Sequence, residues 1–148
     1  MNACAETLTF TDLSVGQQAA FDVTVTQQDI DRFADLSGDR SPLHVDAAFA
    51  RRRGYEDRVA HGAFLVALAS RLVGMSLPGQ NALLLTSQMS FLSPVLPGAR
   101  LRVTGTVDQM SDSVRSVVVK VGFTDIDRGT PIARGRLTIG FTEETARG

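Results

Sequence analysis

Residues 61–75 read HGAFLVALASRLVGM and carry apolar side chains on nearly every face of a predicted helix. A helix that lies on a protein surface keeps one polar face, so this pattern indicates a helix enclosed by other parts of the structure. Helical spacing changes to the alternation of strands near Pro78, and the segments that could wrap the helix follow from there. The stretch therefore predicts one buried helix packed against a sheet.

Five segments have the pattern of strands. Residues 19–26, AAFDVTVT, alternate Phe21, Val23 and Val25 with polar neighbours, which is the period of a half-buried strand. Four more candidates follow the helix and are separated by turn-rich segments: ALLLTSQMSF, RLRVTGTVDQM, RSVVVKVGFTDI and PIARGRLTIGFT. We therefore expect an α+β fold in which residues 1–148 form a single domain, with about five antiparallel strands around a long central helix and residues 1–10 loosely ordered.

The composition favours a protein of the cytoplasm and does not indicate a nucleic-acid or membrane partner. A formal net charge of -1 and a pI of about 6.1 give no sign of a surface for nucleic acid or anionic membrane. The single cysteine, Cys4, excludes an intrachain disulfide and a zinc site built from cysteines, and the first residues lack a signal-peptide pattern. The longest apolar run, AFLVALA, is far shorter than the roughly 20 residues that cross a bilayer, so we expect no membrane span.

An acid and an imidazole lie five positions apart in residues 38–46, GDRSPLHVD. The preceding helix is predicted to begin with a capping box at Thr26 and Asp29 and to end near Gly38. Pro42 then restricts the backbone between Asp39 and His44, so the pair is held by a rigid turn. Such a pair can activate a water molecule by general acid–base chemistry near neutral pH. Spacing alone favours a capped polar loop with no catalytic role.

His61 and Gly62 stand directly before the central helix, where free backbone N–H groups and the helix dipole favour negative charge. Gly62 would let a ligand approach the backbone, and its N–H could stabilise charge developing on a thioester oxygen. A plain helix-start glycine fits the same pattern. His61 could contact substrate or have a structural role. Ser70, two helical turns after Gly62, could bond Asp39 or the water, or be an ordinary helix serine.

A basic run and a further acid flank these positions. Arg51, Arg52 and Arg53, with Arg58 nearby, could meet the phosphates of a coenzyme A or phosphopantetheine group, although such a run is more often a solvated helix face. Asp46 directly precedes the segment AAFARRRG and is predicted to be its N-cap, not a catalytic acid.

Residues 33–50, FADLSGDRSPLHVDAAFA, resemble the signature of the MaoC-like, (R)-specific enoyl-CoA hydratases. The likeness continues through VAHGAFLVALAS and SFLSPVLPGARL, so it extends from the first helix to the third strand. The positions that fit the signature are Phe33, Ser37, Gly38, Asp39, Pro42, Leu43, His44 and Ala50. One position departs from it, because Ser41 stands where the family has asparagine. A serine hydroxyl is shorter and has a single donor, so the catalytic turn is expected to be looser or the pocket reshaped.

The resemblance implies a hot-dog fold, usually a homodimer, and hydration of a trans-2-enoyl thioester to the (R)-3-hydroxyacyl thioester or the reverse dehydration. It implies no metal or redox cofactor, with coenzyme A or phosphopantetheine serving as the carrier of the acyl group. By position, Asp39 and His44 would activate water and Gly62 would polarise the thioester carbonyl. Ser70 would support the acid, and Ser41 and His61 would line the substrate site. A hot-dog acyl-CoA thioesterase and a non-catalytic acyl-CoA-binding module remain the alternatives.

Overall fold

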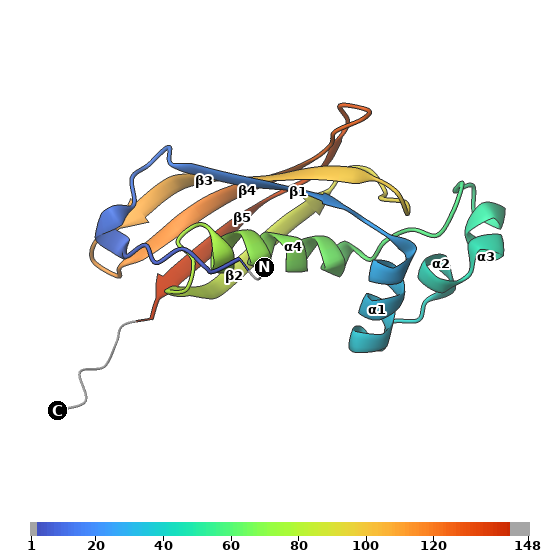
Figure 1. The fold of residues 1–148 in the computed structure, drawn as a ribbon, viewed down its shortest axis with the longest axis horizontal. Helices are drawn as coiled ribbons and strands as arrows, with labels where there is room; N and C mark the ends of the chain where they lie inside the picture. The colour runs from blue at the N-terminus through green and yellow to red at the C-terminus, as the bar shows by residue number, and fades with distance from the viewer. Residues whose placement is uncertain (1–2, 143–148) are drawn as a thin grey trace.

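A five-stranded antiparallel sheet covers one long helix in the computed structural model, which describes residues 3–142 (Figure 1). The strand order across the sheet is β1-β3-β4-β5-β2, so β1 and β2 form its two edges. The expectation of five antiparallel strands is confirmed. Their bounds are Gln18–Thr24 for β1, Ala82–Phe91 for β2, Arg100–Ser111 for β3, Ser116–Asp125 for β4 and Pro131–Phe141 for β5.

The central helix α4, Gly62–Met75, packs its apolar side against the concave face of this sheet. Alternate residues of β3 and β4 point toward it, as the burial of every second residue in both strands shows. Gly105 on β3 allows the closest approach, because a Cβ there would lie 2.3 Å from the Cδ2 atom of Leu72. The sheet and the helix thus share one hydrophobic core, to which α4 contributes Leu65, Leu68, Ala69, Leu72 and Val73.

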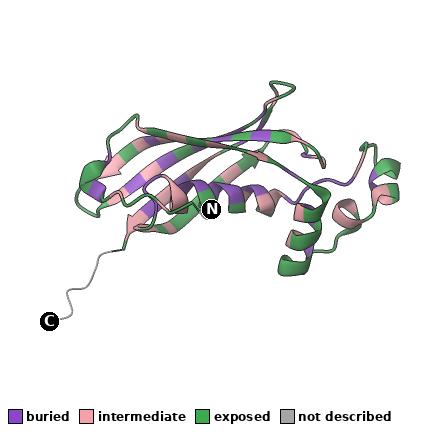
Figure 2. Ribbon diagram, viewed as in Figure 1, coloured by how far each residue is buried: buried purple, intermediate pink, exposed green. Residues whose placement is uncertain are grey.

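The other side of α4 is not enclosed, which corrects the expectation of a helix wrapped on all faces. Ala63, Ala67 and Ser70 are exposed, and Figure 2 shows buried and less buried residues alternating along α4. A single layer of five strands curves around only part of a helix, so small residues on the remaining side stay open in one copy of the chain. The apolar residues on every face of α4 therefore led us to expect burial on all sides, whereas one sheet buries only the side that it contacts.

Residues 27–61 form an arm that lies beyond the end of the sheet, next to the start of α4 (Figure 1). It contains α1, Gln27–Ser37, α2, Pro42–Val45, and α3, Ala47–Arg52. The capping box at Thr26 and Asp29 begins α1, and Gly38 ends it with a φ of 76°, as the sequence predicted. The Asp46 carboxylate caps α3 by accepting a bond from the Phe49 N–H at 3.0 Å, again as predicted.

The segment before β1 lies against the end of α4 and the residues that follow it. The Glu6 N–H donates to the carbonyl of Met75, the last residue of α4, and the Leu8 N–H donates to that of Pro78; Phe10 is buried. Burial of this aromatic ring holds the chain start against the body, although residues 1–2 lie outside the described range. Among residues 3–142, no helix has the length and apolar character needed to cross a membrane.

Candidate active site

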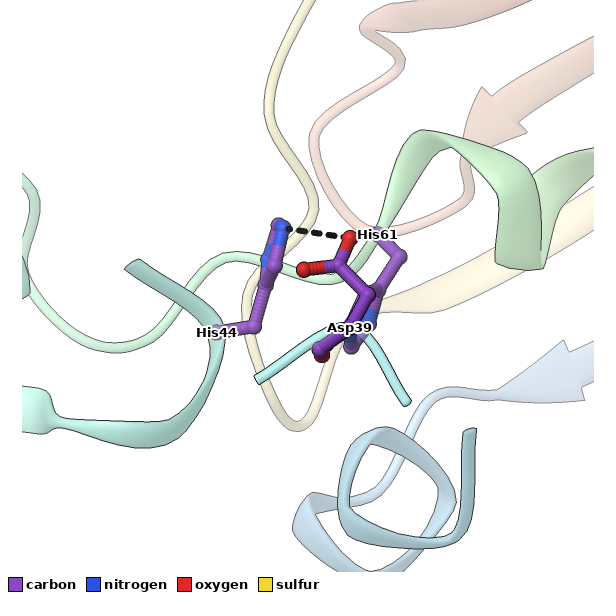
Figure 3. A group of neighbouring side chains, drawn as sticks. All are labelled: Asp39, His44 and His61. Atoms are coloured by element: carbon purple, nitrogen blue, oxygen red, sulfur yellow. Dashed lines mark hydrogen bonds and ion pairs between the residues drawn. The ribbon is translucent and has the colours of Figure 1, made fainter. Parts of the chain in front are cut away.

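The turn between α1 and α2 brings the Asp39 carboxylate to the His44 imidazole (Figure 3). Oδ2 of Asp39 lies 3.9 Å from Nε2 of His44. The Asp39 side chain is 53% exposed and that of His44 only 15%, so the pair lies at the edge between solvent and the interior. At this separation the two groups are too far apart for a direct hydrogen bond but can share one water molecule.

The orientation of His44 is fixed by a main-chain carbonyl from the end of the arm. Nδ1 of His44 lies 2.6 Å from the carbonyl oxygen of Val59. A carbonyl only accepts hydrogen bonds, so Nδ1 carries the hydrogen and Nε2 presents a lone pair toward Asp39. His44 is therefore poised to accept a proton from a group held between it and the carboxylate.

The Asp39 turn is held by main-chain atoms and by the end of α1. The Ser41 N–H donates to Oδ1 of Asp39 at 3.1 Å, and the Asp39 N–H donates to the Ser37 hydroxyl at 3.1 Å. The Ser41 residue is exposed and its side chain makes no capping hydrogen bond. Because the Ser41 contribution comes from its backbone, the replacement of the family's asparagine leaves this contact to Asp39 intact.

His61 is the third member of the cluster in Figure 3 and is only 2% exposed. Its Nε2 lies 2.9 Å from the Asp39 carbonyl oxygen, and its ring stacks on that of His44 with 3.8 Å between centroids. One potential metal-binding atom from each of the three residues lies within 4.8 Å of the others. The two stacked rings are inclined by 24°, so their nitrogen lone pairs lie in nearly parallel planes.

Gly62 and His44 line the same cavity, which has a volume of about 380 Å³. Gly62 is the first residue of α4, so its N–H is among those that lack a partner within the helix. The Phe91 ring lies against it, with Cζ 3.3 Å from the position of a Cβ at Gly62. Most of the remaining wall is apolar, including Val59, Leu65, Leu92 and Val95. An acyl chain fits such a lining.

Two other groups of candidate residues lie apart from this cluster. Ser70 is exposed, about 12 Å along the helix axis from Gly62 at 1.5 Å per residue, and no hydrogen bond joins it to Asp39 within residues 3–142. Arg58 is buried in an ion pair with Asp31 at 2.6 Å, which gives it a structural role in the arm. Arg51, Arg52 and Arg53 are exposed on and just after α3, as the solvated-face interpretation predicted.

Sequence reasoning missed the Val59 carbonyl and Phe91. Val59 acts through its backbone, which no side-chain pattern reveals, and it meets His44 across fifteen positions of the chain. Phe91 is the last residue of β2 and comes to Gly62 only through the tertiary fold. The signal available in advance was the apolar residue at the strand end, which by itself indicates only packing.

The sequence and the fold of this chain are similar to those of known proteins. A family model described as MaoC like domain matches residues 11–129. The (R)-specific enoyl-CoA hydratase of Rhodospirillum rubrum is 30% identical over 130 residues, which cover 88% of this chain and 89% of that protein. The 3-hydroxybutyryl-CoA dehydratase of Methylorubrum extorquens is 33% identical over 103 residues, which cover 70% of this chain and 66% of that protein.

The fold is also that of a solved hydratase. The unliganded R-hydratase PhaJ1 from Pseudomonas aeruginosa superposes with a TM-score of 0.87 at 30% identity, covering 95% of this chain and 89% of that one. The sheet and central helix described above are therefore a hot-dog fold, as the resemblance implied. With its sequence matched across both the arm and the sheet, the chain belongs to the MaoC-like family of hydratases and dehydratases, which are hydro-lyases.

Proposed function

We propose that this protein catalyses the (R)-specific hydration of a trans-2-enoyl-CoA to the (R)-3-hydroxyacyl-CoA and the reverse dehydration. The observation that carries the proposal is the lone pair of His44 Nε2, which faces the Asp39 carboxylate beside the apolar cavity that begins at Gly62. The relatives named hydratase and dehydratase support the same reaction class.

In the proposed mechanism, Asp39 and His44 hold one water molecule between them. As the water oxygen bonds to Cβ of the enoyl group, the pair removes a proton from the water and returns a proton to Cα. Negative charge develops on the thioester oxygen while the bond to Cβ forms and before Cα takes up its proton, and the Gly62 N–H at the start of α4 stabilises this charge. The reaction transfers only the elements of water, so the proposal requires no metal or redox cofactor. Coenzyme A or phosphopantetheine enters as the carrier of the substrate.

The direct test is hydration of short-chain and medium-chain enoyl-CoA, followed by loss of the absorbance of the conjugated thioester. Asp39→Asn and His44→Asn are each expected to lower kcat by at least about 100-fold, the scale of a lost general acid or base. Asp46→Asn is the matched control, because an asparagine caps α3 as well as an aspartate and lies in the same segment.

Two outcomes would replace this proposal. Release of free thiol from a saturated acyl-CoA, without hydration of any enoyl-CoA, would identify a thioesterase. Tight binding of acyl-CoA without turnover of either substrate would identify a binding module.

We further propose that the active form is a homodimer. The edge strand β2 has Leu83 and Leu85 exposed by 52% and 54%. An unpaired edge with exposed leucines is a surface that a second copy can cover. Leu85→Lys is expected to shift the mass in light scattering from dimer to monomer, whereas Val114→Lys, at a residue 70% exposed between β3 and β4, should leave the dimer intact. A wild-type monomer would contradict the proposal.

A further inference from the structure

His61 is a buried histidine for which the proposed mechanism has no proton-transfer role. It is the N-cap residue of α4, yet its side chain makes no capping bond. The His61 residue is 2% exposed, so its ring has almost no contact with water. Burying an imidazole stabilises a protein only if its contacts compensate for the lost hydration. Its ring lies 5.0 Å from that of Phe33, and its closer contacts are with Asp39 and His44, the two residues assigned to the water.

The hydrogen bond to Asp39 fixes the state of the His61 ring. The Asp39 carbonyl can only accept, so His61 Nε2 carries the hydrogen and donates to it at 2.9 Å. Nδ1 is then left as a lone pair, and within residues 3–142 it is the buried side-chain polar atom that has no hydrogen-bond partner. The sequence therefore keeps a histidine at a place where one of its two nitrogens is unused.

Stacking explains why a histidine is suited to this position. The His61 and His44 rings lie 3.8 Å apart between centroids and are inclined by 24°. This contact restricts the tilt of the His44 ring, while the Val59 carbonyl fixes its rotation. A glutamine would supply the donor to Asp39 without the ring, and a phenylalanine would supply the ring without the donor. Histidine supplies both from one side chain at the rigid start of α4.

From these contacts we infer that His61 is a positioning residue, which holds the Asp39 main chain through Nε2 and the plane of the His44 ring through stacking. This inference rests on the proposed function, because the placement matters only if the pair acts on water. His61 holds Asp39 and His44 of the arm in place at the start of α4. This role does not involve direct contact of His61 with the substrate.

The first experiment uses the unaltered protein, which contains only two histidines. Two-bond ¹H–¹⁵N correlation spectra at a pH of about 8, above the usual titration of a free histidine, report which nitrogen of each ring carries the hydrogen. We expect the Nδ1–H form for His44 and the Nε2–H form for His61. The stacked rings should also shift each other's ring-proton resonances upfield. The opposite form at His61, or rings without this mutual shift, would overturn the inference whatever the activity.

The second experiment compares His61→Gln with His61→Phe. The His44 ring protons should lose their upfield shift in the glutamine variant and keep it in the phenylalanine variant. Both variants are expected to lower kcat for enoyl-CoA hydration by about 10-fold to 100-fold, since misplacement of reacting groups by about 1 Å has this scale of effect. KM should stay within about twofold of the wild-type value, because His61 does not hold the substrate.

The results separate the two proposals. A rise in KM with kcat unchanged in both variants would show that His61 binds substrate and would overturn the positioning role while leaving the proposed function in place. A wild-type protein that hydrates no enoyl-CoA would overturn the proposed function. The inference that His61 positions catalytic groups would then also be wrong, even if the spectra show the expected ring forms.

Discussion

At the scale of single residues, the contact between Gly62 and Phe91 gives a sharp test of the start of α4. A methyl group at residue 62 would lie 3.3 Å from the Phe91 ring and would reduce the cavity next to His44. Gly62→Ala is therefore expected to lower kcat/KM on the order of 100-fold, because the thioester can no longer approach the backbone. Steady-state kinetics with a short enoyl-CoA measures the loss.

Gly74→Ala, on the same helix, is the matched control. A Cβ at this position meets nothing within 4 Å, and alanine is the better helix former by about 1 kcal/mol. The control should keep full activity and unfold at the wild-type temperature or slightly above it. Full activity in Gly62→Ala as well would remove Gly62 from the active site.

The residue scale also shows how far the sequence could predict the site. The proximity of Asp39 and His44 could be predicted, because they are close in sequence and a proline restricts the turn between them. The direction of the His44 ring could not, since it depends on the Val59 carbonyl. The concern over Ser41 came from its side chain, whereas its contact with Asp39 is made by its main chain.

At the scale of elements, the packing of α4 on β3 depends on the absence of a side chain at Gly105. A Cβ there would lie 2.3 Å from Leu72 Cδ2, and Leu72 is fully buried. Gly105→Ala is expected to reduce the free energy of unfolding by about 1–3 kcal/mol through overpacking. Chemical denaturation of the single variants and of Gly105→Ala/Leu72→Ala would measure the coupling. We expect the second substitution to cost less in the Gly105→Ala background than alone. Strictly additive losses would show that the two residues do not press on each other.

The helix starts could be predicted from short sequence patterns, but the order of the strands in the sheet could not. The capping box of α1 and the Asp46 cap of α3 lie within a few residues of the helices that they begin. The order β1-β3-β4-β5-β2 depends on pairing between segments far apart along the chain, for which the alternation pattern carries no information. The sequence pattern also could not show that one side of α4 is left open. It reports which residues are hydrophobic, but not how many layers of structure cover them.

At the scale of the whole molecule, ion pairs across the outer face of the sheet make stability depend on pH. Asp108 on β3 accepts from Lys120 on β4 at 3.1 Å and from Arg136 on β5 at 2.9 Å. The Lys120 hydrogen bond, together with the charges of Lys120 and Arg136, lowers the pKa of Asp108 from its ordinary value of 3.8. A lowered pKa in the folded state stabilises the fold above the unfolded pKa, and this contribution is lost as pH falls through the folded pKa.

Asp108→Asn should therefore unfold at a lower temperature than the wild type at pH 7, and the difference should shrink as the pH falls below 3.8. Thermal unfolding followed by circular dichroism across this range measures it. Asp112→Asn serves as the control, because Asp112 is exposed and forms no ion pair within residues 3–142. A difference that stays constant with pH would mean that Asp108 acts through packing and not through its charge.

The division between arm and body has a consequence for how activity is lost. Asp39 and His44 belong to the arm, whereas Gly62 begins a helix buried under the sheet, and His61 joins the two. The exposed helices of the arm bury fewer residues than the sheet, so they are expected to open at a smaller free energy than the sheet unfolds. Amide hydrogen exchange should then be faster in α1 and α3 than in β4. Heating would first separate the proposed proton-transfer groups from the proposed oxyanion donor, so hydratase activity is expected to be lost while the sheet remains folded.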